Sequence, residues 1–400
     1  MKLFFTFTVA LLLSVFGGTN ISSQQITNLT NKDIRWKVDK IKLPTDATLF
    51  SVSFPDKDNG WIGGSSGSLF KTTNGGASWD AVQVPDIDEK SIRELYFVDK
   101  DKGWIVTSER GIFLHKYGQG NLETGFTSDA GKSWTMKKIN KGIGIHRIRF
   151  RGKNQGWMIG SKGEKDQFGV PRSQPYLLST NDSGKNWTDI SSNVITAVNS
   201  FLTMKELTLF IQGIHEITWS SDAKVLLFLG YGMIVSSANG TSDWQVEVMP
   251  QERPPQPGYE AFVNGFLLDK NVIQLISSIA SDHHGTGSDI TIREPDKTYK
   301  TEFISNIALN ETIRFNDGAE LAAGQEGYIS SDNGKLVLPR GVIFASKEKG
   351  SNWYEVTEKK SLSTTDKEPE IPLLHGIAKS SENEAWAVGV RGTIVKIYRK

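Results

Sequence analysis

The stretch KTTNGGASWD, residues 71–80, is a polar turn that ends on a tryptophan. The same outline returns as FTSDAGKSWT at 126–135, as STNDSGKNWT at 179–188 and as ASKEKGSNWY at 345–354. In every copy a hydroxyl residue is followed by an amide or carboxylate, then by a glycine and finally by the tryptophan. Four copies of one turn indicate a repeated architecture rather than a single surface loop.

Each position of the turn has a physical role. The hydroxyl and the amide or carboxylate can accept hydrogen bonds from the N–H groups of the turn, and the glycine takes a positive φ. The tryptophan ring then folds back onto the neighbouring sheet, where its indole N–H finds a carbonyl. The residues in these roles are Thr72, Asn74, Gly76, Trp79, Thr127, Asp129, Gly131, Trp134, Thr180, Asp182, Gly184, Trp187, Ser346, Glu348, Gly350 and Trp353.

The spacing of the turn tryptophans sets the size of the repeat. Trp79, Trp134 and Trp187 are 55 and 53 residues apart, and Trp353 follows after about three more such periods. A period of this length, with several short strands in each unit, predicts the blades of a β-propeller.

Two weaker copies of the turn fall in the gap before Trp353. SANGTSDW, residues 237–244, occupies the next expected position with one residue too many in the turn. DKTYKTEF, residues 296–303, occupies the position after that in a decayed form. Upstream of the first three turns, a Gly-Trp pair ends an alternating run and predicts a hairpin between the first two strands of each blade.

The last repeat, residues 373–400, contains three strands and lacks a fourth. Residues 34–41 resemble the fourth strands of other blades and can supply it. A ring closed in this way leaves no exposed strand edge. We therefore predict an all-β, seven-bladed β-propeller that forms a single domain over residues 34–400, with the fifth and sixth blades the most divergent.

Composition and the first residues bear on location and partners. Lys and Arg number 46 against 45 Asp and Glu, a net charge of +1 that argues against a nucleic-acid partner.

Residues 1–23 have the layout of a secretory signal peptide, with an uncleaved anchor as the alternative, and 24–33 form a linker. There is no cysteine for a disulfide or a lipid. We expect an exported monomer, periplasmic or secreted, without a cofactor or metal.

The turns are identified as Asp-box, or BNR, repeats. Together with the Gly-Trp hairpins they make the chain similar to the photosystem II stability and assembly factor family, over most of 34–400 and most strongly over 49–189. The resemblance implies a non-enzymatic protein that holds a protein partner, and a lumenal location if the source is photosynthetic. Asp-box turns also occur in sialidases, xyloglucan-cleaving enzymes and sorting receptors, so a glycoside hydrolase or lectin is the alternative function.

Counting back eleven residues from the tryptophan in the second strand of a repeat gives Phe50, Arg93, His146 and His375 at the start of a first strand. His215 falls near the same level, and His283 and His284 lie on a loop between second and third strands. Insertions around 117–125, 162–175, 281–288 and 324–341 fall on the same side. We predict a binding face there. The histidines are either separate rim residues or a cluster that binds a metal or responds to pH.

The segment HRIRFR, residues 146–151, places Arg147, Arg149 and Arg151 on one side of a strand. These arginines either pair with carboxylates of the adjacent blade or form a patch for anions or acidic peptides. No spacing singles out two carboxylates of a glycosidase, and no other catalytic motif is present, so we predict no catalytic residue. The candidate binding residues are Arg93, His146, Arg147, Arg149, His215, His283, His284 and His375.

Overall fold

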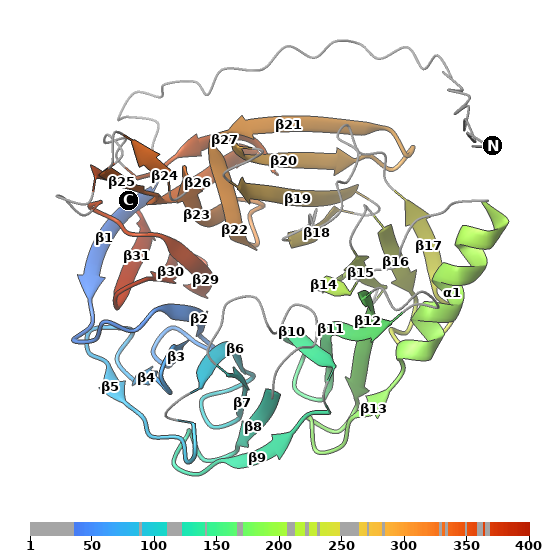
Figure 1. Ribbon diagram of the computed structural model, residues 1–400, viewed down its shortest axis with the longest axis horizontal. Coiled ribbons are helices and arrows are strands. Elements are labelled where there is room, and N and C mark those ends of the chain that lie inside the picture. The colour runs from blue at the N-terminus through green and yellow to red at the C-terminus, as the bar shows by residue number, and fades with distance from the viewer. Residues whose placement is uncertain are drawn as a thin grey trace, which may run out of the picture.

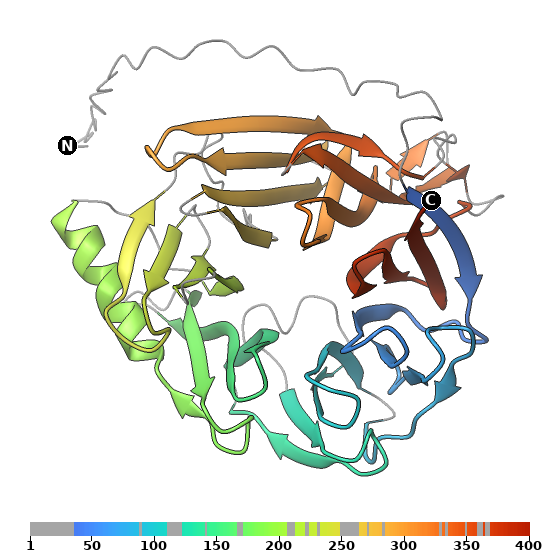
Figure 2. The ribbon, with the colours of Figure 1, turned by 180° about the vertical axis from the view of Figure 1, so that it is seen from behind.

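The computed structural model forms a closed ring of seven four-stranded antiparallel sheets, within the residues that it describes (Figure 1; Figure 2). The predicted seven-bladed propeller is confirmed. The predicted signal peptide and linker lie outside the described part of the chain, in which no helix is long and apolar enough to cross a membrane. The described residues are 36–87, 90–109, 122–140, 142–165, 171–205, 213–220, 224–229, 233–248, 264–269, 272–281, 285–327, 330–332, 335–348, 350–357, 363–364 and 369–400.

Within each blade we name the strands A to D from the axis of the ring to its rim. Blades 1 to 3 are β2 (Leu49–Ser53), β3 (Gly60–Gly64), β4 (Leu69–Thr72) and β5 (Asp80–Ala81); β6 (Ser91–Phe97), β7 (Gly103–Ser108), β8 (Leu122–Thr127) and β9 (Thr135–Lys138); and β10 (Ile143–Arg151), β11 (Gln155–Lys165), β12 (Pro171–Thr180) and β13 (Thr188–Asp189).

The other four blades continue in chain order, except that the last one takes its strand D from the other end of the chain. Blades 4 to 7 are β14 (Ile214–Trp219), β15 (Val225–Leu229), β16 (Met233–Ser237) and β17 (Gln245–Val248); β18 (Asn264–Asp269), β19 (Val272–Ser281), β20 (Gly285–Arg293) and β21 (Tyr299–Ser305); β22 (Ile307–Arg314), β23 (Glu320–Glu326), β26 (Arg340–Glu348) and β27 (Ser351–Glu355); and β29 (Leu374–Ser381), β30 (Glu384–Gly389), β31 (Thr393–Arg399) and β1 (Trp36–Lys42).

The ring is closed by β1, which pairs antiparallel with β31 from Trp36 opposite Arg399 to Lys42 opposite Thr393. Trp36 is buried against Phe315 of the neighbouring blade, with their ring centroids 5.0 Å apart. The predicted closure is therefore confirmed, and the first strand is anchored by a large aromatic side chain as well as by its hydrogen bonds.

The two sides of the ring differ in the connections that they carry. On one side, the hairpin face, lie the hairpins that join strands A to B and C to D. On the other, the loop face, strand A begins and strands B and C are joined. All four predicted insertions fall between strands B and C, as expected. The one in blade 6 contains β24 (Ser330–Asp332) and β25 (Lys335–Leu338), which pair with each other, and β25 also pairs with β28 (Ser363–Thr364).

Successive blades of the regular part pack through three aromatic rings, which we call an aromatic triad. The strand-B tryptophan of one blade stacks on a phenylalanine at the end of strand A of the next blade. That phenylalanine in turn contacts the turn tryptophan of its own blade. Successive ring centroids are 3.7–6.4 Å apart, as expected of packed aromatic pairs. The triads are Trp386–Phe54–Trp79, Trp61–Phe97–Trp134 and Trp104–Phe150–Trp187.

The turns have the hydrogen bonds that the sequence predicts. In blade 2 the Gly131 N–H donates to Thr127 Oγ1 at 2.9 Å, and Asp129 accepts from the Ser133 N–H at 2.9 Å. Gly131 has a φ of +82°. The Trp134 indole N–H donates to the Gly131 carbonyl at 3.2 Å.

The predicted contact of the indole N–H with a carbonyl is wrong for two turns. The buried indole N–H groups of Trp79 and Trp244 have no hydrogen-bond partner, although both rings pack against hydrophobic core clusters. The turn of blade 4 also has no extra residue: Ser237 to Trp244 spans the same distance in sequence as Thr72 to Trp79, with its glycine one position earlier.

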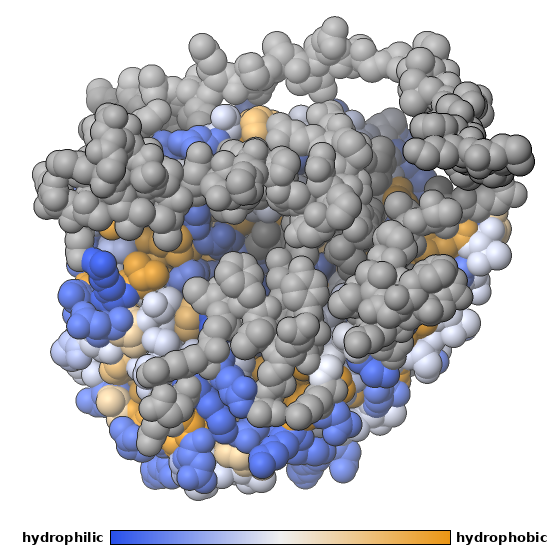
Figure 3. All heavy atoms as spheres, viewed as in Figure 1, coloured by the Kyte–Doolittle hydropathy of each residue, from blue (hydrophilic) through white to orange (hydrophobic). Residues whose placement is uncertain are grey.

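One helix of the described chain, α1 (Ser191–Met204), was not expected from the sequence. It follows β13 and packs on β12 and β17 at the rim (Figure 1). Val194, Val198 and Leu202 recur every fourth residue and form its buried face. Elsewhere the rim over β5, β9 and β13 is mainly hydrophilic (Figure 3), in keeping with the exposure of these strands.

Candidate functional site

In the described part of the chain, strand A of six blades has a β-bulge near its first residues, on the loop face. In blade 2, for example, the pairing with strand B shifts between Ile92 and Glu94, so Arg93 is the extra residue. The four residues that the sequence places at the start of strand A all occupy this position, and His215 does too. The bulged residues are Phe50, Arg93, His146, His215, Asn310 and His375.

Three bulged residues of blades 7, 1 and 2 stack on one another. The Arg93 guanidinium lies 3.9 Å from the centre of the Phe50 ring, and the Phe50 and His375 ring centroids are 5.3 Å apart. Arg93 Nε donates to Ser108 Oγ at 3.3 Å. Burial, reinforced by the Arg93 charge, lowers the pKa of His375 to about 4. His375 is therefore neutral at physiological pH, and Arg93 carries the charge of this stack.

The bulged histidines of blades 3 and 4 form a second pair. The ring centroids of His146 and His215 are 5.7 Å apart. His146 Nδ1 lies 2.9 Å from the Ile214 carbonyl, so Nδ1 carries a proton, and Nε2 lies 3.4 Å from Ser161 Oγ. Among the residues that the structure describes, no group of three or more His, Cys, Asp or Glu side chains is arranged so that it could hold a metal ion. His283 and His284 lie outside that part.

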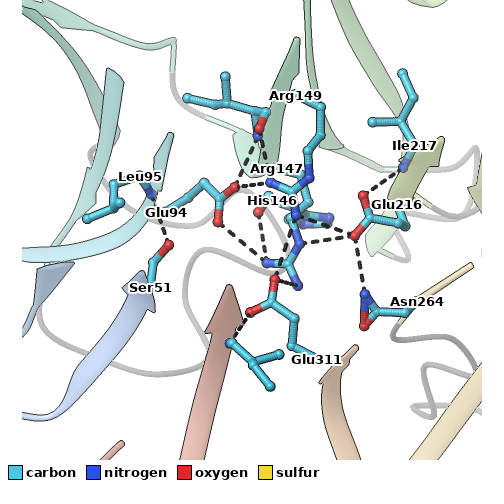
Figure 4. Close-up of polar contacts among 12 residues, drawn as sticks. Ser51, Glu94, Leu95, His146, Arg147, Arg149, Glu216, Ile217, Asn264 and Glu311 are labelled. Carbon is cyan, nitrogen blue, oxygen red and sulfur yellow. Dashed lines mark hydrogen bonds and ion pairs between the residues drawn. The ribbon is translucent and has the colours of Figure 1, made fainter. Parts of the chain in front are cut away.

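Beneath the bulges, charged side chains converge on the axis of the ring (Figure 4). Arg149 Nη1 is 2.7 Å from Glu94 Oε1, and its Nη2 is 3.6 Å from Glu216 and 3.7 Å from Glu311. Arg147 lies 3.4–3.8 Å from the same three carboxylates. We call these two arginines and three glutamates the axial network. It joins blades 2, 3, 4 and 6.

Side chains at the same level also satisfy backbone groups of the next blade. Strand A has no neighbour on its axial side, so some of its N–H groups need another acceptor. Ser51 Oγ accepts from the Leu95 N–H at 3.1 Å, and Glu94 Oε1 from the Ile148 N–H at 3.2 Å. Glu311 does the same for blade 7. The axial network therefore joins the blades to one another.

Two of the three arginines in residues 146–151 form ion pairs with carboxylates of other blades. Arg147 and Arg149 pair with carboxylates of adjacent blades, and also with Glu311 of a more distant blade. Arg151 is separate: it bonds to Gln155 and its guanidinium lies 5.6 Å from the centre of the Trp157 ring. The positive charge of Arg147 and Arg149 is thus matched by carboxylates inside the ring.

The axial network has one more acid than base. Burial raises the pKa of Glu311, although Arg147 and Arg149 oppose that effect. Burial opposes the charge of Arg147, but the three glutamates together hold its pKa above the usual value. The protonation of Glu311 can therefore remove the excess negative charge.

The sequence interpretation missed Glu94, Glu216, Glu311 and Asn310. A signal was present, because the residue after each bulge lies ten positions before the strand-B tryptophan. The same count that found Arg93 would have found Glu94 one position later. It would not have found Glu216 or Glu311, since blades 4 and 6 have leucine in place of that tryptophan.

Comparisons with known proteins support the fold and the family resemblance. Residues 29–125 match the family described as Photosynthesis system II assembly factor YCF48. No curated protein matches the sequence. A solved structure of YCF48 bound to D1 peptide is 17% identical, with a TM-score of 0.59, over 95% of this chain and all of that one. YCF48 from Cyanidioschyzon merolae is 14% identical, with a TM-score of 0.58, over 90% of this chain and 99% of that one.

The same fold occurs in an enzyme. A GH74 xyloglucanase from Xanthomonas campestris is 11% identical, with a TM-score of 0.53, over 89% of this chain and 53% of that one. At such identities the likeness establishes the propeller fold, whereas the match over 29–125 confirms the resemblance to the assembly-factor family.

Proposed function

We propose that this protein is a non-enzymatic propeller that binds a segment of another protein on its loop face. The observation that carries the proposal is Arg93. Among the described residues it has a hydroxyl and an aromatic ring as neighbours but no ion pair. The similar YCF48 structure with a bound D1 peptide supports a peptide as the ligand.

Arg93 differs in this respect from the arginines of the axial network. Arg147 and Arg149 are matched by three carboxylates, whereas the charge of Arg93 is available to a ligand. A carboxylate placed over it would gain charge-assisted hydrogen bonds to the guanidinium. Phe50 and the neutral His375 beside it would pack against apolar parts of the same ligand. The favoured partner is therefore an acidic peptide segment.

Residues 1–23 are proposed to direct the protein out of the cytoplasm, to the periplasm, the exterior or, in a photosynthetic source, the thylakoid lumen. The partner would then be an exported or membrane protein. N-terminal sequencing of the mature protein from an envelope fraction tests this proposal. A mature chain that begins at Met1 would contradict it.

The binding proposal is tested by capture from an envelope extract with a tagged protein, followed by an affinity measurement on the partner identified. We expect Arg93→Ala to weaken that affinity by about tenfold or more while the melting temperature stays nearly unchanged. Lys138→Ala is the matched control, because it removes one positive charge from an exposed rim strand. Equal binding by the two variants would refute the role of Arg93.

A glycoside hydrolase is the alternative function, and Glu311 is the observation that favours it. Three carboxylates converge at the axis, and the raised pKa of Glu311 would suit a general acid. However, the side chains of Glu94 and Glu216 are only 5% and 6% exposed and already serve as acceptors within the ring. Assays with a panel of fluorogenic glycosides distinguish the two functions. Turnover that Glu311→Gln abolishes would establish a glycoside hydrolase and overturn the binding proposal.

A further inference from the structure

A cavity of about 960 Å³ lies between blades 4 and 5. Its walls include Ser220 and Lys224 from the A–B hairpin of blade 4 and Pro295 and Lys297 from the C–D hairpin of blade 5. It therefore lies at the hairpin face, on the opposite side of the ring from Arg93.

The cavity occupies the place of a missing aromatic triad. In blade 4, Leu226 lies opposite Thr218, and in blade 2 the strand-B tryptophan Trp104 lies opposite the equivalent residue, Tyr96. Leu226 therefore occupies the strand-B tryptophan position of blade 4. By the same register Leu267 replaces the phenylalanine of strand A, and Tyr299 replaces the turn tryptophan. All three line the cavity. The loss of two large aromatic rings at one junction explains why this junction is hollow whereas the regular ones are filled.

The polar floor of the cavity is satisfied within the protein. Arg293, at the position of the turn hydroxyl, donates from Nε and Nη2 to the two carboxylate oxygens of Glu247 at 2.9 and 2.7 Å. The Tyr299 hydroxyl donates to the same carboxylate at 3.1 Å. Because the buried arginine and its carboxylate neutralise each other, a ligand need not supply a charge at the floor.

Further out, the cavity is aromatic and positively charged. Trp219 and Phe201 are half-buried and line its wall. Lys224 and Lys297 are exposed at the rim on opposite blades. With Arg293 and Glu247 counted, the charged lining residues are three cations and one anion, a net charge of +2. The rim therefore favours acidic groups around an apolar interior.

We propose that this cavity binds an aromatic side chain carried on an acidic peptide segment of a protein partner. An indole or phenyl ring would take the place that the protein's own rings fill at the regular junctions. Carboxylates beside it in sequence would reach Lys224 and Lys297. The volume lies in the range of ligand pockets and exceeds one aromatic side chain, so neighbouring parts of the peptide can enter too. This site is independent of Arg93 and gives the hairpin face a binding role.

The proposal can be tested by titrating ¹⁵N-labelled protein with a blocked tripeptide, glutamate-tryptophan-glutamate. The chain has 11 tryptophans, whose indole signals report from around the ring. We expect the Trp219 signal, assigned with Trp219→Phe, to shift most, and the Trp187 signal in the turn of blade 3 to stay in place. The glutamate-alanine-glutamate peptide should bind about tenfold more weakly or not at all. Equal binding of the two peptides, or shifts away from Trp219, would overturn the proposal.

Two variants separate the cavity from its charge. Leu226→Trp should fill the space and abolish the shift. The double variant Lys224→Glu with Lys297→Glu changes only exposed residues, so it is expected to fold even if Leu226→Trp does not. It should reverse the preference toward a lysine-tryptophan-lysine peptide. Lys185→Glu, in the corresponding turn of blade 3, is the control and should leave affinity unchanged. Unaltered acidic-peptide binding by the double variant would also overturn the proposal.

Discussion

The side chains that fill the space between successive blades differ between the regular blades (7, 1, 2 and 3) and the divergent blades (4, 5 and 6). The strand-B position holds tryptophan in blades 7, 1, 2 and 3, but Leu226, Gln274 and Leu321 in blades 4, 5 and 6. At the junction of blades 3 and 4, Trp157 Nε1 donates to the Gly240 carbonyl at 3.0 Å. At that of blades 5 and 6, Gln274 Nε2 donates to the Gly350 carbonyl at 3.3 Å.

The hydrogen bond from the strand-B side chain to the turn of the next blade therefore persists at the junction of blades 5 and 6, although glutamine replaces tryptophan there. The volume of the ring is less easily replaced. At the junction of blades 4 and 5 a cavity occupies the place of the aromatic ring. At the junction of blades 5 and 6 a fully buried carboxylate, Glu320, lies beside Gln274 and Arg314. The regular junctions therefore supply stability, and the divergent ones are where ligand binding and pH dependence are expected.

Deletion of residues 36–42 should have the largest effect, because it opens the ring. The blade would lose all seven register pairs of β1 and the burial of Trp36. We expect a loss above the ~3–5 kcal/mol typical of truncating one buried tryptophan. Urea denaturation measures it, and a synthetic 36–42 peptide added in trans should restore part of the stability. An unchanged midpoint would contradict closure by β1.

Within the regular junctions, the two kinds of tryptophan should differ. Trp104 is 2% exposed, so Trp104→Ala should cost about 3–5 kcal/mol through the cavity that it leaves. Trp134 is half-buried at the edge of its triad, and Trp134→Ala should cost only about 1–2 kcal/mol. Denaturation of both variants under one set of conditions makes the comparison. Equal losses would mean that the turn tryptophan matters as much as the strand-B one.

At the junction of blades 5 and 6, stability should depend on pH. Burial raises the pKa of Glu320 from 4.5 to about 7, against the opposing charge of Arg314. Between these values the folded state holds a proton that the unfolded state has released, so stability falls as the pH rises. Glu320→Gln should remove this slope and be favourable at pH 7.5, on the order of 2–3 kcal/mol. Urea midpoints at pH 5 and pH 7.5 test it, and an unaltered slope would exclude Glu320 as its source.

The smallest effect is expected in the turns themselves. Side-chain and backbone hydrogen bonds from Ser133 lower the pKa of Asp129 to about 2. The stability that Asp129 adds is therefore present above pH 3.8 and lost as the pH falls toward 2. Asp129→Asn should shift the melting temperature only slightly at pH 7, since Asn74 fills the same role in blade 1. A large shift would show that the turn needs a charge.

The sequence predicted the ring well because its signals are periodic. Repeated turns and Gly-Trp pairs indicate the same packing in blades 1 to 3, and the missing strand of the last blade followed from counting strands. It did not predict α1, because that helix is stabilised by packing on β12 of blade 3 and β17 of blade 4 rather than by a repeat. It placed the bulged residues at the start of strand A, and the same count reaches Glu94 one position later. The contacts that join Glu94, Glu216 and Glu311, and the cavity, depend on side chains from blades distant in sequence, which no local pattern reports.

The most direct test of this account is the stability of the double variant Leu226→Trp with Leu267→Phe, compared with the wild type by urea denaturation. If the junction of blades 4 and 5 is a vacant aromatic triad, these rings should fill it and raise the free energy of unfolding, by about 1–2 kcal/mol. If the junction has no room for these rings, overpacking should lower the free energy of unfolding by about 1–3 kcal/mol. That result would contradict a vacant triad at this junction.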